Sequence, residues 1–197
     1  MFSRKKSLLT QKSVLALAGG LCLAATLALG AYASDALLTG NFAPVVEGEL
    51  YRSAQLGNGL MRQNVRRYGI KTILNLRGAN PGEHWYDKEI ADAKALGVVH
   101  IDFSMSAKHQ LSQDQAGKLI DLMAKAPKPL LIHCNAGSDR TGLAAALYLA
   151  SIAKRGEEAA EGQLSLRFGH LPLPFLPEYA MDRTWEALEP WLGFPNS

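Results

Sequence analysis

His133-Cys134-Asn135-Ala136-Gly137-Ser138-Asp139-Arg140-Thr141-Gly142 carries the clearest structural signal in this chain. The apolar run 130–132 comes directly before it and predicts a strand, and the Leu- and Ala-rich run 143–150 comes directly after it and predicts a helix. A loop of this length between a strand and a helix can point its backbone N–H groups at one anion, and the helix adds the positive end of its dipole. The segment therefore predicts an anion-binding loop in an α/β fold.

A cysteine opens this loop and an arginine closes it. The planar guanidinium of Arg140 is suited to gripping two phosphate oxygens at once. The same positive surroundings favour the thiolate form of Cys134, which is the nucleophilic form. A buried structural cysteine is the alternative, but it explains neither the arginine nor the two glycines Gly137 and Gly142. The pattern indicates attack by sulfur on phosphorus.

The loop resembles the signature of the cysteine-dependent protein tyrosine and dual-specificity phosphatases, which runs His-Cys, five residues, Arg, Thr or Ser, and Gly. Segments 41–42, 48–53 and 73–77 also resemble the opening of a bacterial branch of this family, many of whose members carry an N-terminal membrane segment. The resemblance covers about residues 41–155. It implies a compact dual-specificity-type fold, with a small central sheet flanked by helices, and two-step hydrolysis without a metal or other cofactor.

The resemblance also implies roles for the loop residues. Cys134 forms a phosphocysteine, and Arg140 holds the equatorial phosphate oxygens as negative charge builds on them. Thr141 assists departure of the thiolate in the second step, although an ordinary helix cap explains its position equally well. His133 is expected to order the loop by hydrogen bonding. Backbone N–H groups complete the cradle, and the predicted substrate-binding residues are Asn135, Ala136, Gly137, Ser138, Asp139, Arg140 and Arg77. 

Arg77 stands outside the loop. It follows a predicted strand at the edge of the sheet where the site opens, so we expect it to bind a second phosphate or an acidic part of the substrate. A plain surface arginine is the alternative reading.

The general acid that protonates the leaving oxygen is ambiguous in the sequence. Asp102 has about the expected separation from Cys134, but it comes immediately after a strand, where it could simply hold backbone N–H groups. Asp139 is the rival and the favoured candidate, because a carboxylate inside an anion cradle should repel the substrate, so its presence there indicates a functional role. A salt bridge to a nearby base is the alternative for Asp139, and Asp114 is a more distant third candidate for the acid.

Charge and cysteine content exclude other classes. Four basic residues and no acidic ones precede residue 34, which leaves 17 of the 21 basic residues against 18 acidic ones in the rest of the chain. Because the charges are balanced, the composition gives no electrostatic support for nucleic-acid binding. Cys22 and Cys134 are the only cysteines, and the five histidines lack metal-ligand spacing, so neither a disulfide framework nor a zinc site is expected.

The N-terminal part of the chain has the layout of a secretory leader. A basic segment precedes the uncharged run 14–33, which ends in the triplet Ala31-Tyr32-Ala33 before Ser34. The run is about 20 residues, which also suits an uncleaved anchor. We therefore expect a signal peptide or membrane anchor at 1–33, a connector at 34–48 and a phosphatase domain at 49–197 that is exported, either periplasmic or anchored at the inner membrane with the domain on the periplasmic side.

The rest of the chain alternates between strand and helix patterns. Strands are predicted at 49–53, 71–76, 98–101 and 130–132, and helices at 60–68, 85–96, 112–124, 157–168 and 179–191. The helix at 112 begins with a capping box formed by Ser112 and Gln115. Alternation of this kind predicts a mostly parallel sheet covered on both faces, preceded here by an N-terminal hydrophobic helix.

The predicted function is therefore hydrolysis of phosphoric monoesters through a phosphocysteine. Resemblance favours a protein tyrosine or dual-specificity phosphatase acting on a phosphorylated protein or a small phosphomonoester. The interior of the loop, 135–138, carries no basic residue, which gives little support to a highly phosphorylated head group. An inositol phosphate or phosphoinositide phosphatase and a catalytically silent phosphate-binding module remain as alternatives. Membrane contact is expected through the N-terminal segment if it is not cleaved.

Overall fold

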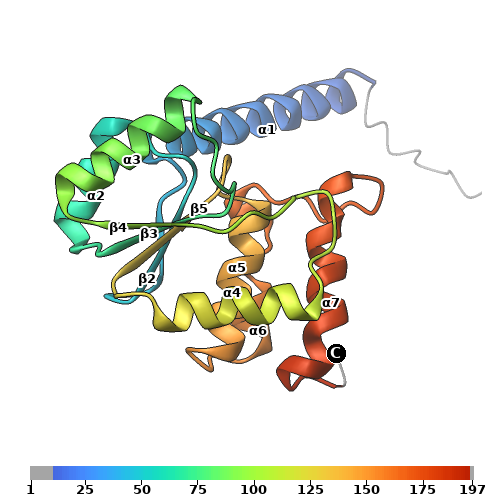
Figure 1. Cartoon of the computed structure of the whole chain (residues 1–197). Coiled ribbons are helices and arrows are strands. Elements are labelled where there is room, and N and C mark those ends of the chain that lie inside the picture. The colour runs from blue at the N-terminus through green and yellow to red at the C-terminus, as the bar shows by residue number, and fades with distance from the viewer. Residues whose placement is uncertain (1–10, 196–197) are drawn as a thin grey trace, which may run out of the picture. The chain divides into compact units, whose positions relative to one another are not determined.

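The computed structural model describes residues 11–195 (Figure 1). The chain divides into an N-terminal unit, Met1–Leu38, and a compact unit, Thr39–Ser197. The first unit consists of most of helix α1 (Gln11–Thr39), and residues 1–10 of the predicted leader lie outside the described part. No helix in the described residues combines the length and the apolarity needed to cross a membrane. The expected N-terminal hydrophobic helix is thus not supported as a membrane span, and the leader and its role in export stay predictions.

A five-stranded mixed sheet forms the centre of the compact unit. Its order is β1-β2-β5-β3-β4, with β1 antiparallel to β2 and all the other neighbours parallel. The strands are β1 (Ala43–Val46), β2 (Leu50–Ser53), β3 (Thr72–Asn75), β4 (Val99–Asp102) and β5 (Leu130–His133). The predicted mostly parallel sheet is confirmed, and β5, which leads into the anion-binding loop, lies in the middle of it.

Strand β1 lies where the sequence predicted a connector at 34–48. Its four residues include Pro44. Proline has no backbone N–H to donate to a neighbouring strand, so it suits a strand at the edge of a sheet. The register shifts between Pro44 and Val46, as at a bulge. A short, irregular edge strand that contains proline leaves no alternating pattern in the sequence. The pattern of these residues therefore predicts a connector and not a strand.

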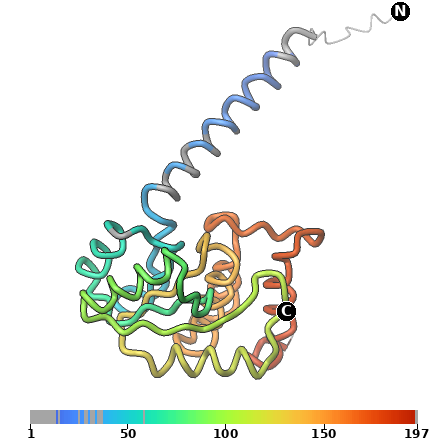
Figure 2. The backbone as a smooth tube through the Cα atoms, turned by 45° about the horizontal axis from the view of Figure 1, so that its top comes forward, coloured from blue at the N-terminus to red at the C-terminus, as the bar shows by residue number. Residues whose placement is uncertain are grey.

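Helices cover both faces of the sheet (Figures 1 and 2). Buried residues of α2 (Asn58–Tyr68) and α3 (His84–Leu96) pack with Leu131 on one face, whereas α4 (Gln113–Lys125), α5 (Asp139–Ser151) and α7 (Ala180–Leu192) pack with Leu130 and Ile132 on the other. This division follows from the two-residue period of a strand, which sends neighbouring side chains to opposite faces. Both faces of β5 are therefore apolar and buried.

Local signals in the sequence place the ends of several helices. The capping box of Ser112 and Gln115 is present at the start of α4. Gly69 and Gly97 end α2 and α3 in the left-handed conformation that glycine adopts without strain. Helix α5 is buried along nearly its whole length, and its small residues allow neighbouring elements to approach closely.

The helix predicted at 157–168 is wrong in its second half. Helix α6 ends at Glu161 (Glu157–Glu161), and the chain then turns into the short 3-10 helix η1 (Leu166–Phe168). Past the break, the carbonyl of Gln163 accepts a 2.9 Å hydrogen bond from the buried Arg52, so it is not available to a continuing helix. A second 3-10 helix, η2 (Pro177–Tyr179), precedes α7.

Candidate active site

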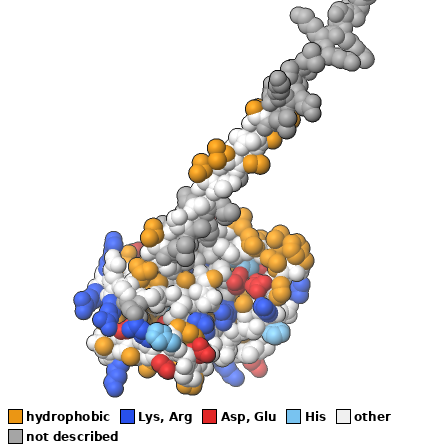
Figure 3. All heavy atoms as spheres, turned by 90° about the horizontal axis from the view of Figure 1, so that it is seen from above, with side chains coloured by type: hydrophobic (Ala, Val, Ile, Leu, Met, Phe, Trp, Pro, Cys, Tyr) orange, Lys and Arg blue, Asp and Glu red, His pale blue; other side chains and the backbone are white. Residues whose placement is uncertain are grey.

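The carboxyl ends of four parallel strands meet at one edge of the sheet. In the register of the sheet, His133 is opposite Ser53 on one side and Asn75 on the other, and Asn75 is opposite Asp102. Open α/β sheets bind ligands at this edge. Seen from above, basic, acidic and histidine side chains are intermingled on this end of the compact unit (Figure 3).

The loop after β5 curls around its first residue. The backbone N–H of Gly137 donates to Sγ of Cys134 at 3.3 Å, and Cys134 is buried. Gly137 has φ +76°, and a Cβ at this position would lie 2.6 Å from the backbone nitrogen of Ala54. Only glycine fits both the conformation and the space. The curled loop therefore packs directly against the backbone at the end of β2.

Three consecutive carbonyls along the curl, those of residues 135–137, are occupied by groups outside the loop. The carbonyl of Asn135 accepts from the backbone N–H of Gln55 at 3.0 Å, and that of Ala136 accepts from the side chain of Asn41 at 3.0 Å. Arg52 takes the carbonyl of Gly137, and the carbonyl of Ser138 is taken within α5. A peptide N–H points opposite to the carbonyl of the preceding residue. The N–H groups that follow these carbonyls are therefore turned toward the inside of the loop, as in an anion cradle.

Arg52 is completely buried beneath the loop. Its Nη2 donates to the carbonyl of Gly137 at 2.7 Å, its Nη1 donates to Gln163, and its guanidinium lies 3.7 Å from the ring centre of Phe168. The planar fork of arginine reaches both partners at once, which a lysine ammonium cannot do. Arg52 thus connects the catalytic loop to the segment after α6.

His133 is held by a buried carboxylate. Its Nε2 lies 3.0 Å from Oε1 of Glu89, and the same oxygen lies 2.8 Å from Nε2 of His100. The side-chain amide of Gln55 donates to the other oxygen of Glu89. Burial alone would raise the pKa of Glu89, but the hydrogen bonds from His100 and His133 outweigh it and lower the pKa to about 2. The base of the loop therefore rests on an ionised carboxylate.

Arg77 is not a plain surface arginine. Its guanidinium lies 3.5 Å from the ring centre of Trp85, and its Nη1 donates to Oε1 of Gln55 at 3.2 Å. Burial and the neighbouring positive charge of Arg140 lower the pKa of Arg77, while Cys134 acts in the opposite direction. Arg77 follows β3 at the sheet edge where β5 leads into the loop, so its positive charge lies on the side of the sheet where Cys134 is found.

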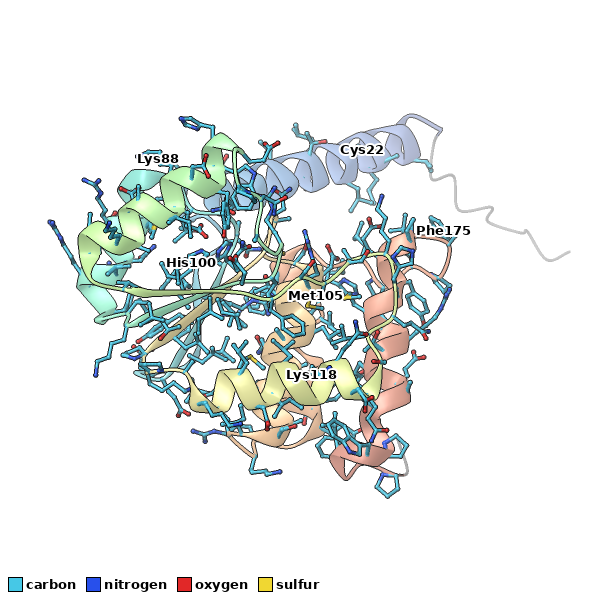
Figure 4. All side chains as sticks on the ribbon, in the orientation of Figure 1. Cys22, Lys88, His100, Met105, Lys118 and Phe175 are labelled. Atoms are coloured by element: carbon cyan, nitrogen blue, oxygen red, sulfur yellow. The ribbon has the colours of Figure 1, made fainter. Side chains whose placement is uncertain are left out.

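Two polar side-chain atoms at the end of the loop are buried without a partner among the described residues. They are Nε of Arg140 and Oγ1 of Thr141. The Nη1 atom of Arg140 donates a weak hydrogen bond, at 3.4 Å, to the carbonyl of Met105. Met105, labelled in Figure 4, lies in the segment after β4. Buried donors normally have acceptors. The oxygens of a phosphate in the loop would supply the acceptor that Arg140 lacks.

Asp102 lies at the end of β4 on the same edge of the sheet. Its Oδ1 accepts from the amide of Asn75 at 2.8 Å, and its Oδ2 accepts from the hydroxyl of Tyr86 at 2.6 Å. This hydrogen bond and then burial raise the pKa of Tyr86 to about 12. Both partners of Asp102 are therefore uncharged, and its side chain is one-quarter exposed. The third candidate acid, Asp114, is an exposed residue in the first turn of α4.

Asp139 is engaged by a histidine that sequence reasoning missed. Its Oδ1 lies 2.8 Å from Nδ1 of His170, and its Oδ2 accepts from the hydroxyl of Ser138 at 2.9 Å. Burial would raise the pKa of Asp139, but these two hydrogen bonds lower it. The geometry matches the salt bridge that the sequence left open. A signal was available, because a carboxylate in an anion cradle calls for a basic partner.

Glu89 was also missed, since nothing local distinguishes it from other acidic residues of an amphipathic helix. Among residues 11–195, no group of three His, Cys, Asp or Glu side chains is arranged to hold a metal ion. The observed site consists of a thiol, a backbone cradle and two arginines.

A curled strand–loop–helix unit with a thiol at its start and a guanidinium at its end defines a cysteine-dependent phosphatase of the dual-specificity type. Residues 42–170 match the family model described as "DSP-PTPase phosphatase fused to NAD+ Kinase", and the chain belongs to this family. No curated protein sequence is significantly similar to the chain.

Solved structures share the fold. Pseudomonas aeruginosa TpbA is 23% identical, with 79% of this chain and 91% of that chain covered and a TM-score of 0.57. The same protein in complex with pTyr is 21% identical, with 80% and 92% covered and a TM-score of 0.57. The core catalytic domain of the PP-IP phosphatase SIW14 from Saccharomyces cerevisiae is 21% identical, with 78% and 93% covered and a TM-score of 0.57.

Proposed function

We propose that Cys134 attacks the phosphorus of a phosphomonoester in line and forms a phosphocysteine that water then hydrolyses. The observation that carries this proposal is the engagement of the carbonyls of residues 135–137 by groups outside the loop, which turns the N–H groups that follow them toward one anion. Arg140 adds its guanidinium, including the buried Nε, as charge builds on the equatorial oxygens. Thr141 presents a buried hydroxyl that stabilises the departing thiolate in the second step.

Asp102 is the proposed general acid. Its hydrogen-bond partners Asn75 and Tyr86 are uncharged, whereas Asp139 is paired with His170. His100 lies 3.9 Å from the Asp102 carboxylate, beyond hydrogen-bond distance. A general acid has to reach the leaving oxygen, and the side chain of Asp102 is one-quarter exposed at the edge of the sheet where β5 ends.

The proposed substrate is a phosphorylated protein, with phosphotyrosine as the first choice. Residues 135–138 contain no basic side chain, which favours a single phosphate over a highly phosphorylated head group. The structure of TpbA with pTyr supports a fold of this kind that accommodates phosphotyrosine. Arg77 gives the site a second cation beside Arg140 and keeps inositol phosphates as the alternative, as does the likeness to the PP-IP phosphatase SIW14.

The first experiment measures hydrolysis of an aryl phosphate by the chain from residue 34 onward. Cys134→Ser should reduce the rate to background, and retained activity would overturn the assignment of the nucleophile. Thr141→Ala should slow the second step and let phosphoenzyme accumulate in a burst. A panel of phosphopeptides and inositol phosphates then compares kcat/KM between the two substrate classes.

Export from the cytoplasm is a separate proposal that rests on the sequence of residues 1–33. Fusing residues 1–48 to a reporter that is active only outside the cytoplasm tests it. An inactive reporter fusion would count against export.

A further inference from the structure

His170 is a buried histidine held between two carboxylates from different elements. It has no exposed surface. Its Nδ1 lies 2.8 Å from Oδ1 of Asp139 at the start of α5, and its Nε2 lies 2.9 Å from Oδ2 of Asp182 in α7. An imidazole with a carboxylate on each ring nitrogen donates to both only when it is protonated. The geometry therefore indicates an imidazolium.

Asp139 needs such a partner because of where it lies. It is the residue directly before Arg140, inside the loop that binds a phosphate dianion. An uncompensated carboxylate here would repel the substrate, and the repulsion is strong because the surroundings are only partly hydrated. Its side chain is 19% exposed, so water screens it incompletely.

We propose that His170 is a positioning residue that neutralises the carboxylate of Asp139 and holds it in place, so that the loop accepts a phosphate dianion despite its acidic residue. Asp182 completes the arrangement by holding the far side of the imidazole. The inference rests on the proposed function, because it concerns how the same loop admits its substrate. It assigns Asp139 and His170 to substrate admission and leaves proton donation to another group.

The decisive variants separate charge from position. In His170→Asn, the side-chain amide can still donate to Asp139 but carries no charge. We expect KM for an aryl phosphate, and the dissociation constant for inorganic phosphate, to rise about tenfold, the scale of one uncompensated charge in a partly buried site. In the double variant Asp139→Asn, His170→Asn, the repelling charge is gone, and both constants should return to within about twofold of the wild-type values.

Controls distinguish this role from a merely structural one. His84 is exposed at the start of α3, and His84→Asn should leave both constants unchanged. If His170 only maintained the fold, His170→Asn would lower the melting temperature and the second substitution would not restore phosphate binding. That result, or unchanged phosphate binding in a folded His170→Asn variant, would overturn the proposal.

Two further measurements keep the inference testable in other circumstances. If His170→Asn does not fold, Asp139→Asn alone still tests the proposal: it should bind inorganic phosphate at least as tightly as the wild type, and weaker binding would contradict the inference. Phosphate binding measured by calorimetry does not depend on turnover. A chain that binds phosphate in this pattern but shows no Cys134-dependent hydrolysis would refute the proposed function and leave the role of His170 standing.

Discussion

The Nη2 atom of Arg52 donates a 2.7 Å hydrogen bond to the carbonyl oxygen of Gly137, while Nη1 donates at 2.9 Å to the carbonyl of Gln163. One buried side chain thus holds both the curled loop after β5 and the segment that follows α6. Arg52→Lys removes the fork but keeps the charge. We expect unfolding in urea to show a loss of about 2–4 kcal/mol, together with reduced kcat/KM. Arg66→Lys on the exposed face of α2 is the matched control and should stay within about 0.5 kcal/mol of the wild type.

Gly137→Ala tests the close contact between the loop and the end of β2. A Cβ would lie 2.6 Å from the backbone of Ala54, so the loop must move away from β2. Its N–H groups would then no longer point at the bound phosphate. We expect kcat/KM to fall on the order of 100-fold, as when a transition-state hydrogen-bond donor is lost. Gly48 has nearly the same φ, +74°, but no neighbour within 4 Å of the added Cβ. Gly48→Ala should therefore cost about 1–2 kcal/mol in stability and leave activity intact. Equal activity losses in both variants would argue against the steric explanation.

Low pH should destabilise the folded protein through protonation of Glu89, which holds His133 at the start of the loop. Its pKa is lowered to about 2 in the folded protein, from an ordinary value of 4.5. The carboxylate therefore contributes stability above the ordinary value, and this contribution is lost as the pH falls through 4.5 toward 2. The full effect is about 3 kcal/mol. Melting temperatures measured from pH 7 to pH 2 should decline less steeply in Glu89→Gln, and parallel curves for the two proteins would contradict the assignment.

High pH should weaken the contact between the loop and α7 through deprotonation of His170. Burial lowers its pKa, but the hydrogen bonds to Asp139 and Asp182 outweigh burial and raise the pKa to about 9, from an ordinary value of 6.5. The stabilisation is complete below pH 6.5 and is lost as the pH rises through 9. The melting temperature should fall between pH 7 and pH 9.5 in the wild type. The fall should be smaller in His170→Asn, and an equal fall in both would assign the alkaline transition to another group.

Asp102→Asn tests the general acid. The basic limb of the kcat profile should disappear, with kcat reduced about 100-fold or more for a substrate with a poor leaving group. A substrate whose leaving group needs no proton should be affected much less. Asp139→Asn should keep the basic limb. If both variants keep it, neither aspartate donates the proton.

The segment that forms the site is local, and this is why the sequence predicted it well. Cys134, Gly137 and Arg140 lie within seven residues of each other, and strand, loop and helix follow directly along the chain. The four strands with an apolar pattern were predictable for the same reason. The chain path after α6 was not, because the side chain that holds it is Arg52, 111 residues away from Gln163 in sequence.

The same distinction applies to the acidic residue of the loop. Sequence reasoning identified Asp139 as an anomaly but could not supply its partner, because His170 is brought to it by the fold across 31 residues. The choice between Asp102 and Asp139 as the general acid was also open in the sequence. The fold supplies their partners: Tyr86 and Asn75 donate to Asp102, whereas His170 lies against Asp139.

The four occupied carbonyls have a consequence for how activity arises during folding. Asn41 and Gln55 reach the loop from the N-terminal side of the compact unit, and Arg52 is itself fixed by Gln163 from the C-terminal side. A fragment that ended before Gln163 would contain all ten residues of the signature, yet its cradle would be incomplete. The reactive thiol therefore acquires its anion-binding surroundings only after both ends of the domain have come together, so incomplete chains should be inactive even though they carry the whole motif.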